Sequence, residues 1–125
     1  MSPHIILITC DELRRDTLSC YGNQAIATPN IDSLAQNGVR YENFHTVSPW
    51  CLPSRCSMLT GKYPHRSGAY SNFRPCPLDD GADNIFKSLQ RGGYKTALFG
   101  KCHFAPVPYG KTRPGQTFPY EEFRD

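Results

Sequence analysis

The eleven-residue stretch Cys51–Gly61 limits the possible fold and chemistry of this chain more than any other segment does. A Pro near its start and a Gly at its end predict a short helix over about residues 53–60. Cys51 then lies just upstream of the helix N-terminus, where backbone N–H groups and the positive end of the helix dipole favour an anion. Arg55, one short turn further on, offers several charged donors to an oxyanion. The stretch therefore predicts a site for a sulfate or phosphate ester beside Cys51.

The same stretch resembles the signature of the sulfatase family. Seven positions match it, namely Cys51, Pro53, Ser54, Arg55, Leu59, Thr60 and Gly61. A buried thiol, a helix cap and a solvated charge would account for two or three of these residue types, but not for seven at fixed spacing. The chain therefore resembles the N-terminal part of a sulfatase. In that family the Cys is converted after translation to formylglycine, which becomes the nucleophile.

An acidic pair follows the first apolar segment of the chain. Ile5–Cys10 is a continuous apolar run, typical of a strand buried on both faces of a parallel sheet. Asp11 and Glu12 come next, at the edge of an open α/β sheet where ligands bind. Their oxygens suit Ca²⁺, Mg²⁺ or Mn²⁺, although from the residues alone Asp11 could equally cap the turn that follows. The resemblance favours a metal site, because the family's acidic pair at this place ligates a metal. This chain departs from the family pattern at Glu12, where Asp is commoner.

A second strand, predicted over residues 94–99, leads into Lys101 and His103. In an extended chain this spacing places both side chains on the same side, where they could bind an anion and protonate a leaving oxygen. A surface Lys beside a satisfied structural His is the alternative. Sulfatases commonly read Gly-Lys-Trp-His here, with the Lys and the His contacting the ester, and this chain has Cys102 in place of the Trp.

Two amphipathic helices are predicted between these strands. One begins at Thr28, as N-cap, and ends before Gly38, and the other begins at Asp83. Their predicted core positions are Ile31, Leu34, Ala35, Ile85, Phe86 and Leu89. The order strand, helix, helix, strand predicts an α/β fold. The resemblance implies the N-terminal portion of an alkaline-phosphatase-like domain, with a mostly parallel sheet flanked by helices.

Charged residues near the N-terminus have two interpretations. Arg14, Arg15 and Asp16 are predicted to form a solvated ion-pair face. The pattern Asp-x-x-Arg-x-Asp followed by Tyr-Gly-Asn also resembles a bacterial branch that includes choline-sulfatase-like enzymes and phosphonate monoester hydrolases. A loop from Asn72 to Gly81 is a further place for substrate-specific contacts.

The length of 125 residues suits one domain with a modest core. Because the sulfatase resemblance implies a much larger catalytic domain, we expect residues 1–125 to be a single, incomplete domain. The family's further metal ligands lie in a later part of the chain, so the isolated polypeptide is expected to be inactive and to bind metal weakly. An exposed sheet face or edge would favour an oligomer or docking to the remainder of the catalytic domain.

Composition narrows the partners and the compartment. The net charge is +3, and the 14 Lys and Arg residues are scattered, which gives weak support for small anionic substrates and none for nucleic acid. The sequence shows no long apolar run and no leader segment, so we expect no membrane and a cytoplasmic protein. The six Cys are then expected to be reduced. A thiol redox protein is disfavoured because no Cys-x-x-Cys pair occurs.

The resemblance implies a mechanism. The formylglycine aldehyde made from Cys51 is hydrated, one oxygen of the diol attacks sulfur, and the other hydroxyl then expels sulfate to regenerate the aldehyde. Asp11, Glu12 and the Cys51 oxygen would hold a divalent metal, expected to be Ca²⁺, with Mn²⁺, Zn²⁺ or Mg²⁺ as alternatives. Arg55 would stabilise the diol, and Lys101 and His103 would bind the ester and assist departure of the leaving group.

The resemblance also implies two partners, and other functions stay open. The partners are a small sulfate-ester substrate and a formylglycine-generating enzyme that recognises Pro53, Ser54 and Arg55. The alternatives are a phosphonate monoester or phosphodiester hydrolase that uses the same aldehyde, and a non-catalytic anion-binding module.

Overall fold

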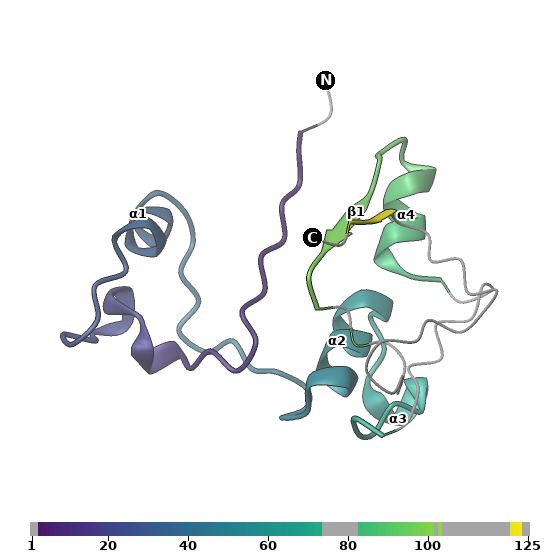
Figure 1. The fold of residues 1–125 in the computed structure, drawn as a ribbon, viewed down its shortest axis with the longest axis horizontal. Coiled ribbons are helices and arrows are strands. Elements are labelled where there is room, and N and C mark those ends of the chain that lie inside the picture. The colour runs from purple at the N-terminus through teal and green to yellow at the C-terminus, as the bar shows by residue number, and fades with distance from the viewer. Residues whose placement is uncertain (1–2, 74–82, 102, 104–120, 124–125) are drawn as a thin grey trace. The chain divides into compact units, whose positions relative to one another are not determined.

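The computed structural model describes residues 3–73, 83–101, 103 and 121–123. The chain divides into two compact units, Met1–Phe44 and His45–Asp125. In the order of the sequence, the elements are the 3₁₀ helices η1 (Arg15–Thr17) and η2 (Ser19–Tyr21), the helices α1 (Pro29–Asn37), α2 (Cys51–Thr60), α3 (Pro64–Ser67) and α4 (Ile85–Arg91), and the strands β1 (Ala97–Phe99) and β2 (Glu121–Phe123) (Figure 1).

The first unit is built from η1, η2 and α1. The prediction of a buried strand over Ile5–Cys10 is wrong for this structure, because these residues are extended without strand pairing and Ile6 and Ile8 are 83% and 76% exposed. A strand buried on both faces needs neighbouring strands to bond its N–H and C=O groups. Within the described residues, the sheet consists of β1 and β2, both of the second unit.

Helix α1 has the predicted start and end, but not the predicted core. It runs from Pro29 to the residue before Gly38, and Thr28 occupies the N-cap position without donating or accepting a capping bond through its side chain. No residue of α1 is buried, and Leu34 is 70% exposed. The expectation that Ile31, Leu34 and Ala35 are core residues is therefore wrong here. Helix α1 contacts η2, and a short 3₁₀ turn covers much less apolar surface than a second helix or a sheet would.

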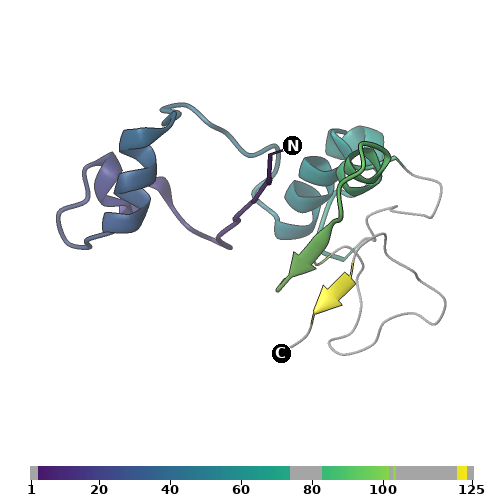
Figure 2. The same ribbon diagram turned by 90° about the horizontal axis from the view of Figure 1, so that it is seen from above.

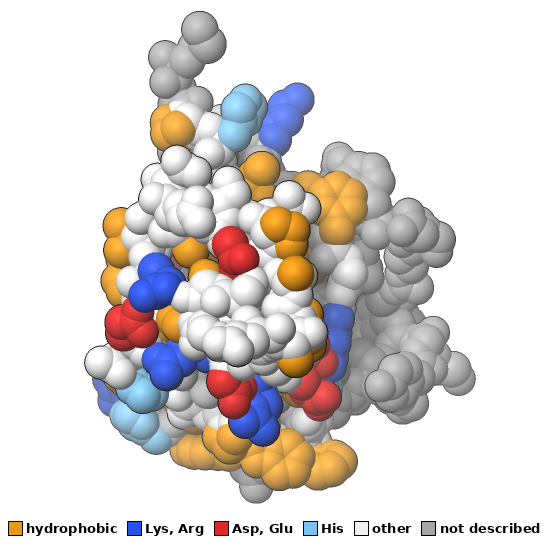
Figure 3. Space-filling model, turned by 90° about the vertical axis from the view of Figure 1, so that its left-hand side faces the viewer, with side chains coloured by type: hydrophobic (Ala, Val, Ile, Leu, Met, Phe, Trp, Pro, Cys, Tyr) orange, Lys and Arg blue, Asp and Glu red, His pale blue; other side chains and the backbone are white. Residues whose placement is uncertain are grey.

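The surface of the first unit carries exposed ion pairs. Arg14 contacts Asp16 at 2.6 Å, and Arg40 contacts Glu42 at 2.7 Å. The predicted solvated ion-pair face is confirmed, since the side chains of Arg14 and Asp16 are 77% and 63% exposed. Lys and Arg side chains are interspersed with Asp and Glu on the face shown in Figure 3. Exposed pairs of this kind contribute little to stability.

The second unit holds the apolar core. Leu52, Cys56 and Leu59 of α2 and the nearby Ala69 are buried, and Phe86 of α4 and Leu98 of β1 pack against them. Of the predicted inward positions on α4, Phe86 and Leu89 are half-buried, whereas Ile85 is 40% exposed. None of the helices in the described ranges has the length and apolar character needed to cross a membrane.

The two described strands form a parallel pair. Ala97 is opposite Glu121 and Phe99 is opposite Phe123, and both strands run in the same direction in Figure 2. β1 covers the second half of the strand predicted over residues 94–99. β2 was not predicted, because a strand of only three residues after a Pro-rich segment is too short to show a strand pattern in the sequence.

Two helix starts differ from the predictions by one or two residues. α2 begins at Cys51 instead of Pro53, because Trp50 is extended and its C=O accepts the first helical bond from Ser54 N–H at 3.1 Å. Pro53 is tolerated in this first turn, where its missing N–H would have had no intrahelical partner. α4 is capped by Asn84, whose side chain accepts from Lys87 N–H at 3.1 Å, and not by Asp83.

Candidate active site

Cys51 is the first residue of α2 and is a half-buried free thiol. Its place within the first turn, and not upstream of it, still puts it at the positive end of the helix dipole. The helix is held firmly behind it, since Leu52 and Pro53 are buried and Gly61 ends the helix in a left-handed conformation with its N–H on Ser57 C=O at 2.8 Å. The candidate nucleophile is therefore mounted on the best-buried element of the described chain.

Arg55 and Lys101 are brought together across 46 positions of sequence. The Arg55 guanidinium donates from Nη1 to the main-chain carbonyl of Lys101 at 2.7 Å. Arg55 is half-buried on α2, one turn after Cys51, and Lys101 is an exposed residue shortly after β1. The structure thus joins two of the predicted site residues, through a main-chain contact that their sequence positions did not predict.

His103 lies close in sequence to Lys101 and is half-buried. The prediction that the Lys101 and His103 side chains lie on one side assumed an extended chain. That assumption is wrong at His103, whose φ is +53°, and Gly100 also has a positive φ of +82°. The chain turns here, so the alternation of an extended strand does not determine where the two side chains point. Cys102, between them, lies outside the described residues.

Asp11 and Glu12 belong to the first unit and are both exposed. Glu12 adopts a positive φ of +57°, an uncommon conformation for a residue with a side chain. Their oxygens have the chemistry that a hard divalent cation prefers. That they share a metal with Cys51 stays a prediction.

Asn72 and Phe73 contact the N-terminus of α2, and neither contact was predicted from the sequence. Asn72 accepts a hydrogen bond from Leu52 N–H through Oδ1 at 2.9 Å, and Phe73 lies edge-on to Trp50 with ring centroids 6.3 Å apart. Residues 72–81 were predicted as a loop with substrate contacts, and most of that loop lies outside the described residues. An Asn twenty residues after the N–H that donates to it gives no sequence signal of capping the helix.

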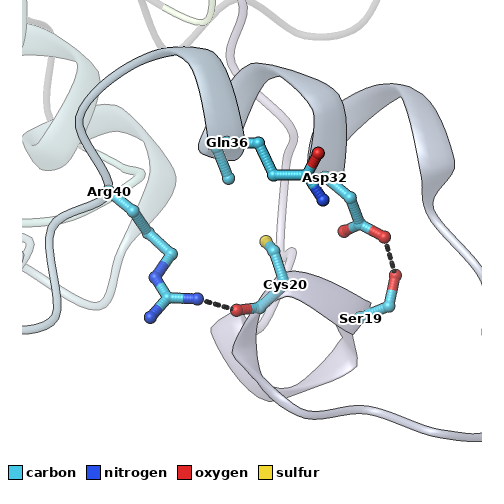
Figure 4. A pocket seen from close by; sticks show the side chains of 6 residues that line it. Ser19, Cys20, Asp32, Gln36 and Arg40 are labelled. Atoms are coloured by element: carbon cyan, nitrogen blue, oxygen red, sulfur yellow. Dashed lines mark hydrogen bonds between the residues drawn. The ribbon is translucent and has the colours of Figure 1, made fainter.

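A cavity of about 230 Å³ lies in the first unit, lined by Ser19, Cys20, Asp32, Ala35, Gln36 and Arg40 (Figure 4). Ser19 Oγ donates to Asp32 Oδ2 at 2.6 Å, and Thr28 Oγ1 donates to Asp32 Oδ1 at 3.1 Å. The Ser19 bond is the main reason that the pKa of Asp32 lies below its ordinary value. Arg40 donates to the carbonyl of Cys20. These bonds tie η2 to the start of α1, so we interpret the cluster as structural.

The cysteines depart from the reduced state that the sequence predicts. Cys56, which is fully buried on α2, is disulfide-bonded. The prediction of a chain without disulfides is therefore wrong at this position. Cys10, Cys20 and Cys51 are free. Cys76 and Cys102 lie outside the described residues.

Known proteins resemble this chain over most of its length. The model of the sulfatase family matches residues 3–125. The chain therefore belongs to the sulfatase family. It is 40% identical over 121 residues to human steryl-sulfatase, covering 88% of this chain and 20% of that protein. It is 38% identical over 109 residues to an N-acetylglucosamine-6-O-sulfatase of Bacteroides thetaiotaomicron, covering 86% of this chain and 19% of that protein. The chain thus spans about a fifth of the length of these curated relatives.

Solved structures agree with this assignment. One of them is a protein solved in complex with its substrate, D-glucosamine-2-N,6-O-disulfate. This chain superimposes on that protein with a TM-score of 0.71 at 33% identity, over 85% of this chain and 19% of that one. The phosphonate monoester hydrolase of Agrobacterium radiobacter gives a TM-score of 0.69 at 31% identity, over 86% and 22%. These matches support the predicted alkaline-phosphatase-like α/β fold, although helices dominate the elements of the described residues themselves.

Proposed function

We propose that the protein hydrolyses sulfate esters with a formylglycine made from Cys51. The observation that carries this proposal is the position of Cys51 at the first residue of α2, with Arg55 one turn behind it and bonded to Lys101. An anionic group beside the first turn of a helix is stabilised by the dipole and by nearby N–H groups. Membership of the sulfatase family gives that arrangement its reaction.

The residues of the second unit divide the work. Arg55 stabilises negative charge at residue 51 and, through its bond to the Lys101 carbonyl, holds the segment after β1 against α2. Lys101, which is exposed, binds the oxygens of the ester. The half-buried His103 gives a proton to the ester oxygen as its bond to sulfur breaks, so that this oxygen leaves as an alcohol. The diol at residue 51 supplies both the attacking oxygen and the hydroxyl that later expels sulfate.

Asp11 and Glu12 would hold a divalent cation, and their exposed carboxylates fit that task. When bound, the cation supplies positive charge that stabilises an anionic nucleophile and the oxygens of the ester. We expect the cation to be Ca²⁺. Mn²⁺, Zn²⁺ and Mg²⁺ are the alternatives, because carboxylate oxygens can bind these ions as well. Asp11, whose match to the family pattern is the better one, is the principal ligand in this proposal.

A phosphonate monoester hydrolase is the second candidate function. The observation in its favour is the 31% identity to the enzyme of Agrobacterium radiobacter. Sulfate and phosphonate esters are both tetrahedral oxyanions, and the helix start and Arg55 suit either.

The experiment compares the hydrolysis of p-nitrophenyl sulfate with that of a phenyl phosphonate ester, using the full-length protein as its host makes it, because the isolated polypeptide is expected to be inactive. A kcat/KM at least about tenfold higher for the sulfate, a difference of about 1.4 kcal/mol in transition-state binding, supports the sulfatase. The opposite preference supports the phosphonate hydrolase. Activity on neither ester, with Cys51 unmodified, leaves the anion-binding module as the remaining account.

A further inference from the structure

We infer that Asn72 is a positioning residue for the reaction, holding the turn of α2 that carries Cys51. This inference rests on the proposed function for its catalytic consequence. Its structural basis is the hydrogen bond from Leu52 N–H to Asn72 Oδ1 at 2.9 Å, which captures the residue directly after Cys51. Leu52 itself is fully buried, so its main chain has little freedom once this bond is made.

The first turn of a helix has N–H groups without intrahelical partners, and a side chain at the N-cap usually satisfies one of them. In α2 the N-cap residue is Trp50, whose side chain makes no capping bond. Asn72 takes over that function from a distance of twenty positions. The N–H of Trp50 is bonded in turn to Ser48 Oγ at 3.2 Å. The main chain is therefore hydrogen-bonded immediately before and immediately after Cys51.

Phe73, the residue after Asn72, makes a second contact with the residue before Cys51. The ring of Phe73 lies edge-on to Trp50, with an interplanar angle of 62° and centroids 6.3 Å apart. Such aromatic pairs contribute packing beyond the area that they bury. Asn72 and Phe73 thus contact Leu52 and Trp50, respectively. The candidate nucleophile, Cys51, is the residue between these two contacts.

The consequence concerns catalysis more than binding. A nucleophile displaced by about 1 Å from its line of attack loses on the order of 10²-fold in rate. The Asn72 side chain acts through Leu52 and is not itself a reacting group. Loss of its bond should therefore lower kcat and leave KM nearly unchanged.

Asn84 offers a matched control. Its Oδ1 also accepts from a first-turn N–H, that of Lys87 at 3.1 Å, but it caps α4 and not α2. N72A and N84A each remove one bond of the same kind. N72D keeps an acceptor of the same length and adds a negative charge.

The test measures kcat and KM on p-nitrophenyl sulfate for the three variants, made in the native host. Rates are divided by the fraction of residue 51 that mass spectrometry finds as aldehyde. We expect N72A to lose between about tenfold and about a hundredfold in kcat, and N84A to lose less than about twofold. N72D should recover kcat to within about threefold of the unsubstituted protein, with a raised KM for the anionic ester. Equal kcat losses in N72A and N84A, or no recovery in N72D, would overturn the inference.

Hydrogen exchange supplies a readout that does not depend on activity. In N72A the amide of Leu52 should exchange at least about tenfold faster, and in N84A at its ordinary rate, because only the first variant removes its acceptor. An unchanged Leu52 exchange rate in N72A overturns the inference. Absence of hydrolysis in the unsubstituted protein, combined with faster exchange in N72A, counts against the proposed function and not against the role of Asn72 in holding the turn.

Discussion

The guanidinium of Arg55 donates to the main-chain carbonyl of Lys101 across 2.7 Å. One residue lies on α2 and the other just after β1, so the bond joins the helix that carries Cys51 to the segment that carries His103. In the proposed function this arginine has two tasks, since its charge would stabilise an anionic group at residue 51 and its fork of donors fixes a neighbouring main chain. Substitutions that separate charge from geometry can therefore distinguish the two.

Arg55→Lys keeps the charge and loses the planar fork of donors. We expect it to lower kcat/KM by about tenfold to a hundredfold, and Arg55→Ala to lower it further, because both charge stabilisation and the Lys101 contact are lost. Steady-state kinetics on p-nitrophenyl sulfate measures this. Arg91→Ala is the control, since the Arg91 side chain is exposed and pairs with Asp83. Wild-type kinetics in Arg55→Lys would show that the fork of donors has no function.

Leu52 is the central residue of the apolar core. Leu52→Ala should lower the free energy of unfolding by about 2–5 kcal/mol, because it leaves a cavity beside Cys56 and Leu59. Leu34→Ala on α1 should change it by less than about 1 kcal/mol, since Leu34 is 70% exposed. Urea titration of both variants measures the difference. Equal losses would contradict the assignment of the core to α2.

Stability should fall in acid through Asp32. The Ser19 bond holds the pKa of Asp32 below its ordinary value, so the folded state binds this proton more weakly than the unfolded state does. The contribution of Asp32 is therefore fully present above about pH 4 and is lost as the pH falls through the lowered folded-state pKa. The urea midpoint, followed between pH 6 and pH 3, should drop less in Asp32→Asn than in the unsubstituted protein. The same drop in both would remove Asp32 from the explanation.

Removal of the divalent cation should abolish turnover. We expect a chelator to reduce activity to background and added Ca²⁺ to restore it, with Mn²⁺, Zn²⁺ and Mg²⁺ compared in the same assay. Asp11→Asn should raise the cation concentration needed for half-maximal activity more than Glu12→Gln does, because Asp11 is proposed as the principal ligand. Asp16→Asn is the control, since Asp16 pairs with Arg14 on the surface. Full activity after chelation would contradict the metal role of Asp11 and Glu12.

The sequence predicted the ends of α1 and α2 well, because their signals are local. Pro29 and Gly38 bracket α1, and Gly61 ends α2 in the left-handed conformation that glycine adopts without a steric penalty. The sequence could not predict the Asn72 bond or the Arg55 contact with Lys101, which depend on where distant segments pack. Ile5–Cys10 failed for a related reason, since an apolar run becomes a strand only where partner strands bond to it.

The left-handed conformation of His103 was also beyond prediction. His adopts a positive φ more often than most residue types but only in a minority of cases, and the strand before it suggested that the extended chain continues. Among the site residues, Cys51 and Arg55 came from the match of Cys51–Gly61 to a family signature, and the others came from the acidic pair after residue 10 and from the segment after the second predicted strand. Their joint geometry depends on tertiary contacts that a spacing rule does not contain.

The conversion of Cys51 to an aldehyde is measured by peptide mass spectrometry. The measurement uses the tryptic fragment containing residue 51, from protein made in its native host. The account predicts the mass and the hydrazine reactivity of formylglycine in most of the fragment. A plain thiol at residue 51, in a host that modifies its other sulfatases, would contradict the account and leave a module that binds anions without hydrolysing them.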